Sequence, residues 1–223
     1  MLKISPGVKN NYPNISVGIM SVKGFASHSI TNDEFDKYID QKISEIKSRY
    51  PDYDRKSVCL NEPLCYYVQY YKKFKKSYHV LHQLESLVLK DRGIPKTIPL
   101  VQAMFLSELD NLLLTAGHDL AKITDTLTLD ICNKSTIKYT SISGSEVQVV
   151  KGDLYLSDAS GAVSSIMIGP DKRTMITEST TDVLYFTYGV PGVGDSYLRK
   201  HLESIASSLK ILIPDLQSNL NIL

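Results

Sequence analysis

Cysteine is scarce in this chain, tryptophan is absent, neither sign of charge predominates, and no long apolar run occurs. The three cysteines, Cys59, Cys65 and Cys132, are odd in number and lack CxxC spacing, which argues against a disulfide framework and a structural zinc site. Twenty-five Lys and Arg accompany 24 Asp and Glu, so the net charge of +1 gives no general attraction for nucleic acid. Electrostatic recognition therefore has to come from local clusters of charge.

The remaining composition is that of an ordinary globular protein. Apolar residues make up 43% and charged residues 22% of the 223 residues, enough to bury a core without a disulfide or a metal. This length predicts one domain with elaborations. No stretch approaches the roughly 18 apolar residues of a membrane span, and Lys3 is not followed by the apolar run of a signal peptide. We expect a cytoplasmic protein in a reducing compartment, with no membrane partner, no metal and no cofactor.

The first half of the chain is predicted to be mainly helical. Alternating apolar residues predict a strand over 14–22. A capping box of Thr31 and Glu34 then predicts a helix over about 32–48. The next predicted helices run from Pro63 into a run of lysines, over about 78–91, and from Pro99 onward.

After Gly117 the apolar period changes from about 3.6 to about 2, which predicts strands. The predicted strands cover 127–131, 136–142, 147–150, 153–157, 162–168, 174–177 and 183–188. A helix over about 195–210 follows them. Helices in succession, then a run of antiparallel strands and a closing helix, indicate an α+β fold.

The most unusual segment is 66–76, which places four lysines and no acidic residue beside five aromatic rings. Lysines contact nucleic-acid phosphates, and aromatic rings stack on unpaired bases. On helical spacing Lys72, Lys73 and Lys76 share a broad face, and Lys75 lies toward its edge. The alternative interpretation is an amphipathic helix whose tyrosines face the core and whose lysines face solvent.

Three other motifs have both a functional and a structural interpretation. His79 and His82 have the spacing of a helical metal pair without a third ligand, which favours a pair at the surface or at a helix end. His118 and Asp119 are expected at a helix end, either facing a cleft or with the carboxylate bound to backbone donors. The glycine-rich run 189–194 lacks GxGxxG spacing and a Walker lysine, which indicates a plain turn.

Several segments, taken in order, resemble one protein family. They are 70–76, 93–95, 98–103, 117–120, 151–155 and 173–180. Together they are similar to the stand-alone proteins built on the B-three/B-four module, the tRNA-binding and editing domain of the phenylalanyl-tRNA synthetase beta subunit. The resemblance implies an α+β fold with a β-sandwich flanked by helices. It also implies tRNA or aminoacyl-tRNA as the partner, and not DNA.

The resemblance further implies a division of the chain and a pocket. Residues 1–60 correspond to an amino-terminal strand and helix packed on the main domain, 61–213 to a tRNA-binding and editing-like domain, and 214–223 to a tail. In the synthetase module, a pocket at the junction of sheet and helices hydrolyses tyrosine that is mischarged on the phenylalanine tRNA. Polar groups there recognise the tyrosine hydroxyl and position water, without a covalent nucleophile.

The matching positions imply the site residues. The family's aspartate falls on Asp119, its histidine on Ala116, and its recognition glutamate on Pro170. His118 and Asp171 stand close to the last two positions and are the candidate catalytic residues, orienting substrate or water. The implied substrate pocket consists of Ala116, Gly117, Asp119, Arg173 and Thr174. We therefore expect the segment 117–119 to meet the segment 171–174.

Two classes of function follow from these residues. One is a free-standing hydrolase that clears a mischarged aminoacyl-tRNA, in which Lys72, Lys73, Lys75 and Lys76 bind the tRNA. The other is a non-catalytic binding module for tRNA or for an amino-acid-like ligand. A sensor of an amino-acid-like small molecule without RNA is the alternative to both.

Overall fold

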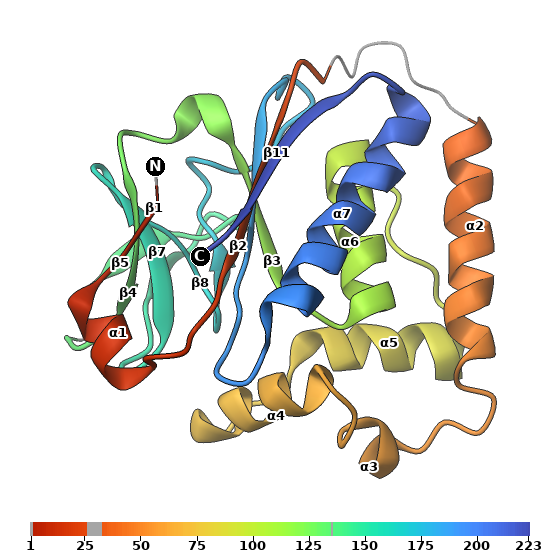
Figure 1. The fold of residues 1–223 in the computed structure, drawn as a ribbon, viewed down its shortest axis with the longest axis horizontal. Helices are drawn as coiled ribbons and strands as arrows, with labels where there is room; N and C mark the ends of the chain where they lie inside the picture. The colour runs from red at the N-terminus through yellow and green to blue at the C-terminus, as the bar shows by residue number, and fades with distance from the viewer. Residues whose placement is uncertain (1, 26–32, 135) are drawn as a thin grey trace.

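The computed structural model describes residues 2–25, 33–134 and 136–223 and has an α+β fold (Figure 1). A five-stranded sheet lies on one side of the molecule, most helices lie on the other, and a four-stranded sheet stands between them. The α+β class predicted from the sequence is confirmed, because helices and antiparallel strands are segregated along the chain and in space.

The five-stranded sheet has the order β1, β4, β7, β8, β9. Its strands are β1 (Leu2–Ile4), β4 (Leu127–Ile131), β7 (Leu154–Asp158), β8 (Gly161–Ser165) and β9 (Gly169–Pro170). Only the β1–β4 pair of this sheet is parallel, and the other pairs are antiparallel. The short helix α1 (Pro6–Asn11) packs against β4. A separate antiparallel ribbon is formed by β5 (Lys138–Thr140) and β6 (Glu146–Gln148).

The four-stranded sheet is antiparallel throughout, in the order β11, β2, β10, β3. Its strands are β11 (Gln217–Ile222), β2 (Gly18–Lys23), β10 (Val183–Thr187) and β3 (Thr115–Asp119). All five residues of both β10 and β3 are buried. The edge strand β3 contacts β9, the edge strand of the other sheet, so the two sheets meet at this point.

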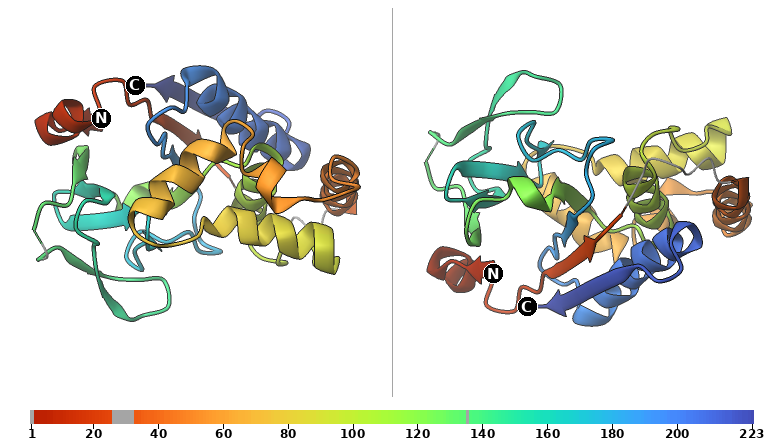
Figure 2. Two further views of the ribbon diagram at one scale, coloured as in Figure 1. Left: turned by 90° about the horizontal axis from the view of Figure 1, so that it is seen from below. Right: turned by 90° about the horizontal axis from the view of Figure 1, so that it is seen from above.

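The helices cover one face of the four-stranded sheet. They are α2 (Asp33–Ser48), α3 (Arg55–Val58), α4 (Leu64–Lys73), α5 (His79–Lys90), α6 (Pro99–Asn111) and α7 (Asp195–Leu212). The 3-10 turn η2 (Leu120–Lys122) is not part of this layer; it directly follows β3 and contacts β10. Helix α7 packs across β2, β10 and β11, and α6 packs on α7 and β3. The views from below and above in Figure 2 show α4 and α5 on one side of this layer and α7 with β11 on the other.

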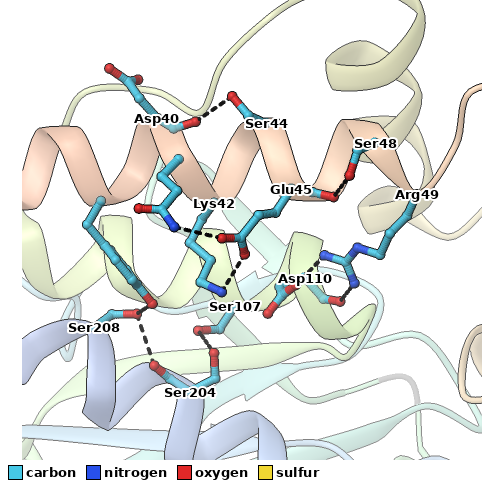
Figure 3. A network of polar contacts seen from close by, with 12 residues as sticks. Asp40, Lys42, Ser44, Glu45, Ser48, Arg49, Ser107, Asp110, Ser204 and Ser208 are labelled. Atoms are coloured by element: carbon cyan, nitrogen blue, oxygen red, sulfur yellow. Dashed lines mark hydrogen bonds and ion pairs between the residues drawn. The ribbon is translucent and has the colours of Figure 1, made fainter.

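Polar contacts join the helices α2, α6 and α7 (Figure 3). Arg49, directly after α2, donates to the Asp110 carbonyl at 3.1 Å and pairs with its carboxylate. Ser107 of α6 donates to Ser204 of α7 at 3.2 Å. Exposed ion pairs add little stability, so these contacts set the alignment of helices that apolar packing holds together.

The helix predictions are confirmed. The helices predicted over 32–48, 78–91 and 195–210 are α2, α5 and α7, and those predicted from Pro63 and Pro99 are α4 and α6. Thr31 of the predicted capping box lies outside the described residues, whereas Glu34 is in the first turn of α2.

Two predictions in the strand-rich half are wrong. His118 and Asp119, expected at a helix end, lie in the strand β3, because α6 ends at Asn111 and the left-handed φ of 58° at Leu112 stops the helix. The segment 174–177 is not a strand, since the Thr174 amide donates to the Asp171 carboxylate at 3.0 Å and forms a turn.

The termini also differ from the sequence expectation. Of the strand predicted over 14–22, only the residues from Gly18 onward belong to β2, and Val17 adds a pair of backbone hydrogen bonds to Leu223. Residues 214–223, expected as a tail, contain β11, which pairs with β2 along its whole length. Only Leu220 and Ile222 of β11 are half-buried apolar residues, so its sequence is a weak strand signal.

Gly189 marks a close approach of two backbones, and we expect the variant Gly189→Ala to be strongly destabilised. A Cβ at this position would stand 1.8 Å from the Ser16 carbonyl oxygen, so the backbone itself has to move. We expect a loss of at least about 3 kcal/mol of unfolding free energy in urea titrations. The matched control is Gly194→Ala in the same turn, where nothing lies within 4 Å of an added Cβ. Equal losses in the two variants would contradict the prediction.

Candidate functional site

A cavity of about 670 Å³ opens between the helices and the junction of the two sheets. Its walls come from the start of α5, from α6 and the residues before it, and from residues 114–117 around the start of β3. Residues 165–170 and 175–176, Ile142 and Tyr188 complete them. The volume lies within the roughly 300–1,000 Å³ that is usual for small-molecule sites. The cavity is therefore large enough for an organic ligand of the size of an amino acid.

Most of the cavity wall is apolar. Val101, Met104 and Phe105 of α6 face the segment after β8, which adds Ile166 and Ile168. The side chains that bring polar atoms to this wall are His79, Gln83, Thr97, Glu108, Thr115, Ser165 and Tyr188. An apolar cavity with a few polar groups suits a ligand with an aromatic or aliphatic part and a small polar part.

Glu108 is the one carboxyl group among the described residues that line the cavity. It lies four residues after Met104 and so on the same face of α6. Its side chain is 2% exposed, and its Oε1 accepts a hydrogen bond of 2.8 Å from the Thr115 amide. Burial raises the pKa of this carboxyl to about 8, although the Thr115 amide acts in the opposite direction. Glu108 is therefore largely protonated at neutral pH.

Thr115 connects the cavity wall to α7. Its Oγ1 lies 2.6 Å from Nε2 of His201 and 3.0 Å from Oγ1 of Thr187. Burial lowers the pKa of His201 to about 3, so the ring is neutral. These buried contacts hold β3, β10 and α7 in one arrangement behind Glu108.

A second buried network runs from the junction of the sheets to the cavity. Nδ1 of His118 is 2.7 Å from Oγ1 of Thr174, which in turn donates to the Asp171 carboxylate. On the other side of the ring, Nε2 is 3.3 Å from Oγ of Ser164, and that oxygen is 2.6 Å from the Tyr188 hydroxyl. Tyr188 reaches the cavity wall, so the network connects the cavity to Asp171.

The hydrogen bonds of this network determine which ring nitrogen of His118 carries the proton. Because the Thr174 hydroxyl donates to Asp171, its oxygen accepts the proton of His118 Nδ1. Nε2 then accepts from Ser164, whose oxygen accepts from Tyr188. Burial first, and the charge of Arg173 second, lower the pKa of His118 to about 4. The ring is thus neutral, with both nitrogens engaged by the protein.

The segments 117–119 and 171–174 meet as the sequence predicted. The Asp119 amide donates to the Thr174 carbonyl at 2.7 Å, in addition to the contact between His118 and Thr174. Of the predicted pocket residues, Ala116 and Gly117 line the cavity, whereas Asp119, Arg173 and Thr174 do not. The two candidate catalytic residues, His118 and Asp171, also lie behind the cavity wall, at 0% and 3% exposure.

Asp119 and Arg173 have structural contacts. The Asp119 carboxylate accepts from the Ala121 amide at 3.1 Å and from the Thr180 hydroxyl at 2.9 Å, and so orders η2 and a neighbouring turn. Arg173 donates to the Lys122 carbonyl at 2.8 Å and to the Asp158 carboxylate at 2.9 Å. Both residues thus stabilise the backbone around the junction of the sheets.

The lysine segment has the exposure that RNA contact requires but not the predicted helical geometry. Lys72, Lys73, Lys75 and Lys76 are all exposed. However, α4 ends at Lys73, and Lys75 has a left-handed φ of 55°, so the four lysines do not share a helical face. The Lys73 ammonium lies 5.3 Å from the centre of the Tyr12 ring and 5.5 Å from that of Tyr70.

Three of the four tyrosines of α4 face the core, and the fourth, Tyr66, is half-buried. Tyr67, Tyr70 and Tyr71 are buried, and each hydroxyl bonds a protein group. Tyr70 donates to the Asp153 carboxylate at 2.9 Å, and burial raises the pKa of Asp153 to about 6. These rings are unavailable for stacking on bases, so the amphipathic interpretation of this segment describes its tyrosines correctly.

The histidine pair has no metal-site geometry. His79 contacts the Tyr71 hydroxyl through Nδ1 at 3.0 Å, and His82 lies 3.4 Å from the Glu85 carboxylate. Within residues 2–25, 33–134 and 136–223, no cluster of three His, Cys, Asp or Glu side chains is placed to hold a metal ion. Across the same ranges, no helix is both long and apolar enough to cross a bilayer.

Sequence reasoning missed Glu108, Thr115 and Tyr188 as cavity residues. Glu108 could have been found from the sequence, because it lies on the apolar face of a helix. An acidic residue at such a position is rarely buried unless another group pairs with it. Thr115 and Tyr188 carried none, because they lie in or next to apolar strand sequences where a hydroxyl is common.

Comparison with known proteins gives a likeness of structure but no match of sequence. No protein-family model and no curated protein sequence matches the chain. A solved structure of an N-terminal fragment of the phenylalanyl-tRNA synthetase beta-subunit from Pyrococcus horikoshii aligns with it at a TM-score of 0.49 and 12% sequence identity. The alignment covers 98% of this chain and 50% of that one, so the chain spans about half the length of the fragment.

Proposed function

We propose that this protein binds the aminoacyl end of a tRNA, with the amino-acid side chain in the cavity and the lysine segment on the RNA backbone. The observation that carries the proposal is the position of the lysines beside the cavity. Lys76 is three residues before His79, which begins α5 and lines the cavity. The sequence segments similar to the B-three/B-four module support the same partner.

Direct bonds join the lysine-bearing helix to the cavity wall. The Tyr71 hydroxyl donates to the Ile166 carbonyl at 2.9 Å and lies 3.0 Å from Nδ1 of His79. Ile166 and His79 both line the cavity. Phosphates bound at Lys72, Lys75 and Lys76 would therefore have a defined position relative to a ligand in the cavity.

The geometry favours binding over hydrolysis. In the hydrolase hypothesis His118 and Asp171 orient substrate or water, but both lie behind the wall with their polar atoms bonded to protein. Their contribution at the cavity is confined to the orientation of the Tyr188 hydroxyl. For the same reason, we expect no rapid hydrolysis of tyrosyl ester on the phenylalanine tRNA.

A panel of aminoacyl-tRNAs tests the proposal. We expect one or a few charged tRNAs to bind more tightly than their uncharged forms. The variant Ile168→Trp, which fills the half-buried rim of the cavity, should remove this difference and leave the binding of uncharged tRNA intact. The control is Leu60→Trp, at a position 79% exposed and outside the cavity. Equal affinity for charged and uncharged tRNA across the panel would contradict the proposal.

The second candidate function is binding of a free amino-acid-like molecule without RNA. The depth and apolar character of the cavity favour it, because the side chains that line the cavity need no RNA to hold such a ligand. In this case free amino-acid derivatives bind with an affinity that Ile168→Trp removes, and no tRNA binds. Release of the amino acid from a charged tRNA would instead support the hydrolase.

We expect the lysine segment to account for the salt dependence of RNA binding. Each neutralised phosphate adds about 0.7 to 0.9 to the slope of log affinity against log salt, so Lys72, Lys75 and Lys76 together contribute about 2 to 3. Changing these three to Glu should remove most of that slope, measured by fluorescence anisotropy. The melting temperature should change little, because all three side chains are exposed.

A charge-matched triple variant is the control for this measurement. Changing Lys37, Lys200 and Lys210 to Glu alters the net charge equally, and these lysines are exposed on α2 and α7. This variant should retain most of the slope. Equal loss in both triple variants would mean that overall charge, and not the lysine segment, drives RNA binding.

A further inference from the structure

We infer that the Glu108 carboxylate binds the ammonium group of the cavity's ligand, which makes that ligand a primary amine such as the α-amino group of an aminoacyl ester. This inference rests on the proposed function and assigns a recognition group to the same cavity. It also applies to the second candidate, because free amino-acid derivatives carry the same amine.

The contacts of Glu108 leave one carboxyl oxygen for a ligand. Oε1 accepts from the Thr115 amide at 2.8 Å. Oε2 has no hydrogen-bond partner in the described part of the chain. Unlike Nδ1 of His201, which also has no partner, Oε2 is not completely buried. Since Glu108 lines the cavity, Oε2 is open to it. A ligand that enters the cavity can thus contact Oε2 directly.

No cation among the described residues neutralises Glu108. Among the described residues, no Lys, Arg or His side chain lies within ion-pair distance of its carboxyl group. The ionisable neighbours that sense its charge are Tyr67, Tyr71 and Tyr78, which are neutral phenols. Burying an ionised carboxyl group without a cation costs free energy of folding. A ligand with a positive charge would offset this cost at Glu108.

An ammonium group supplies both a hydrogen-bond donor for Oε2 and the positive charge that Glu108 does not receive from the described residues. It donates to Oε2 and supplies the positive charge that keeps the carboxylate ionised in an apolar wall. Burial raises the pKa of Glu108 to about 8, and a bound ammonium lowers it again. A carboxylate or phosphate at this position cannot form this ion pair, because it has the same sign of charge as the ionised Glu108.

Binding of paired small esters to the full-length protein tests this inference. The probes are the methyl esters of L-tyrosine, L-phenylalanine and L-leucine, each compared with the ester that has hydrogen in place of the amino group. Affinities are measured by titration calorimetry below the pKa of the amine. The variants are Glu108→Gln, whose amide oxygen still accepts from Thr115, and Glu146→Gln, an exposed carboxylate on β6 as control.

We expect Glu108→Gln to weaken binding of at least one amino ester by about 10- to 100-fold, the usual strength of a hydrogen bond to a charged group. Binding of the matching ester without an amine should change less than about twofold. Thermal unfolding with and without ligand confirms that each variant is folded.

Two results would overturn the inference, and they have different consequences. If the amino ester binds wild type and Glu108→Gln equally, or if esters without an amine bind as well as those with one, Glu108 is not the amine-binding group and the proposed function stands. If no ester of either series binds, the cavity is not an amino-acid site and the proposed function fails with the inference.

Discussion

The variant Glu108→Gln is expected to gain stability relative to the wild type as the pH rises from about 5 to about 9. Burial raises the pKa of Glu108 from 4.5 to about 8. A raised pKa in the folded state contributes stability that is fully present below 4.5 and is lost as the pH rises through about 8. Because each pKa unit corresponds to 1.36 kcal/mol, the expected relative gain is about 4 kcal/mol.

Urea unfolding of both proteins across this pH range measures the gain. The difference between them isolates Glu108, since His118, His201 and Asp153 titrate alike in both proteins. Glutamine retains an oxygen that accepts from the Thr115 amide, so the variant should fold. The control is Glu146→Gln, whose side chain is 68% exposed and which should follow the wild type. Parallel curves for wild type and Glu108→Gln would mean that the carboxyl group is solvated in solution.

We also expect a large loss of unfolding free energy in acid, which depends on His118. Its pKa is lowered from 6.5 to about 4 by burial and then by the charge of Arg173. A lowered pKa in the folded state contributes stability that is present above 6.5 and is lost as the pH falls through about 4. His118 alone should therefore remove about 3 kcal/mol over this range, and His201 acts in the same direction.

The variant His118→Asn removes this titration and keeps one bond. The Asn amide nitrogen takes the place of Nδ1 and donates to Thr174, while Ser164 loses its acceptor. We expect a loss of about 1 to 3 kcal/mol near neutral pH and a smaller further loss in acid than in wild type. Urea unfolding at about pH 7.5 and about pH 4.5 gives both numbers. An equal acid loss in both proteins would assign the whole effect to His201 and the carboxyl groups.

Local periodicity predicted the helices well because a surface helix shows its buried face in the sequence. The apolar stripes of α2, α5 and α7 repeat at three and four residues, and these helices begin and end close to the predicted positions. Strand β3 was missed because it has no exposed face and therefore no such pattern. Its sequence, Thr115 to Asp119, is buried at all five positions, so no alternation marks it.

The candidate site was predicted in part. The contact between the segments 117–119 and 171–174 followed from the family resemblance, and the structure contains it. The exposed lysines followed from composition. The position of His118 did not, because a residue in a predicted helix end can face a cleft, whereas β3 directs this side chain toward Thr174 and Ser164 inside the protein. The roles predicted for His118 and Asp171 stay predictions.

The sequence by itself determined the α+β class, the helices, and the exposed cluster of Lys72, Lys73, Lys75 and Lys76. These depend on composition and on patterns over fewer than about twenty residues. Only the tertiary structure decided which polar groups reach the cavity. Glu108 lies in α6, Thr115 in β3 and Tyr188 directly after β10, and their convergence requires that the strands β3 and β10 pair beneath α6. Burial then decides their chemistry, because the pKa of a carboxyl group depends on what surrounds it and not on its neighbours in the chain.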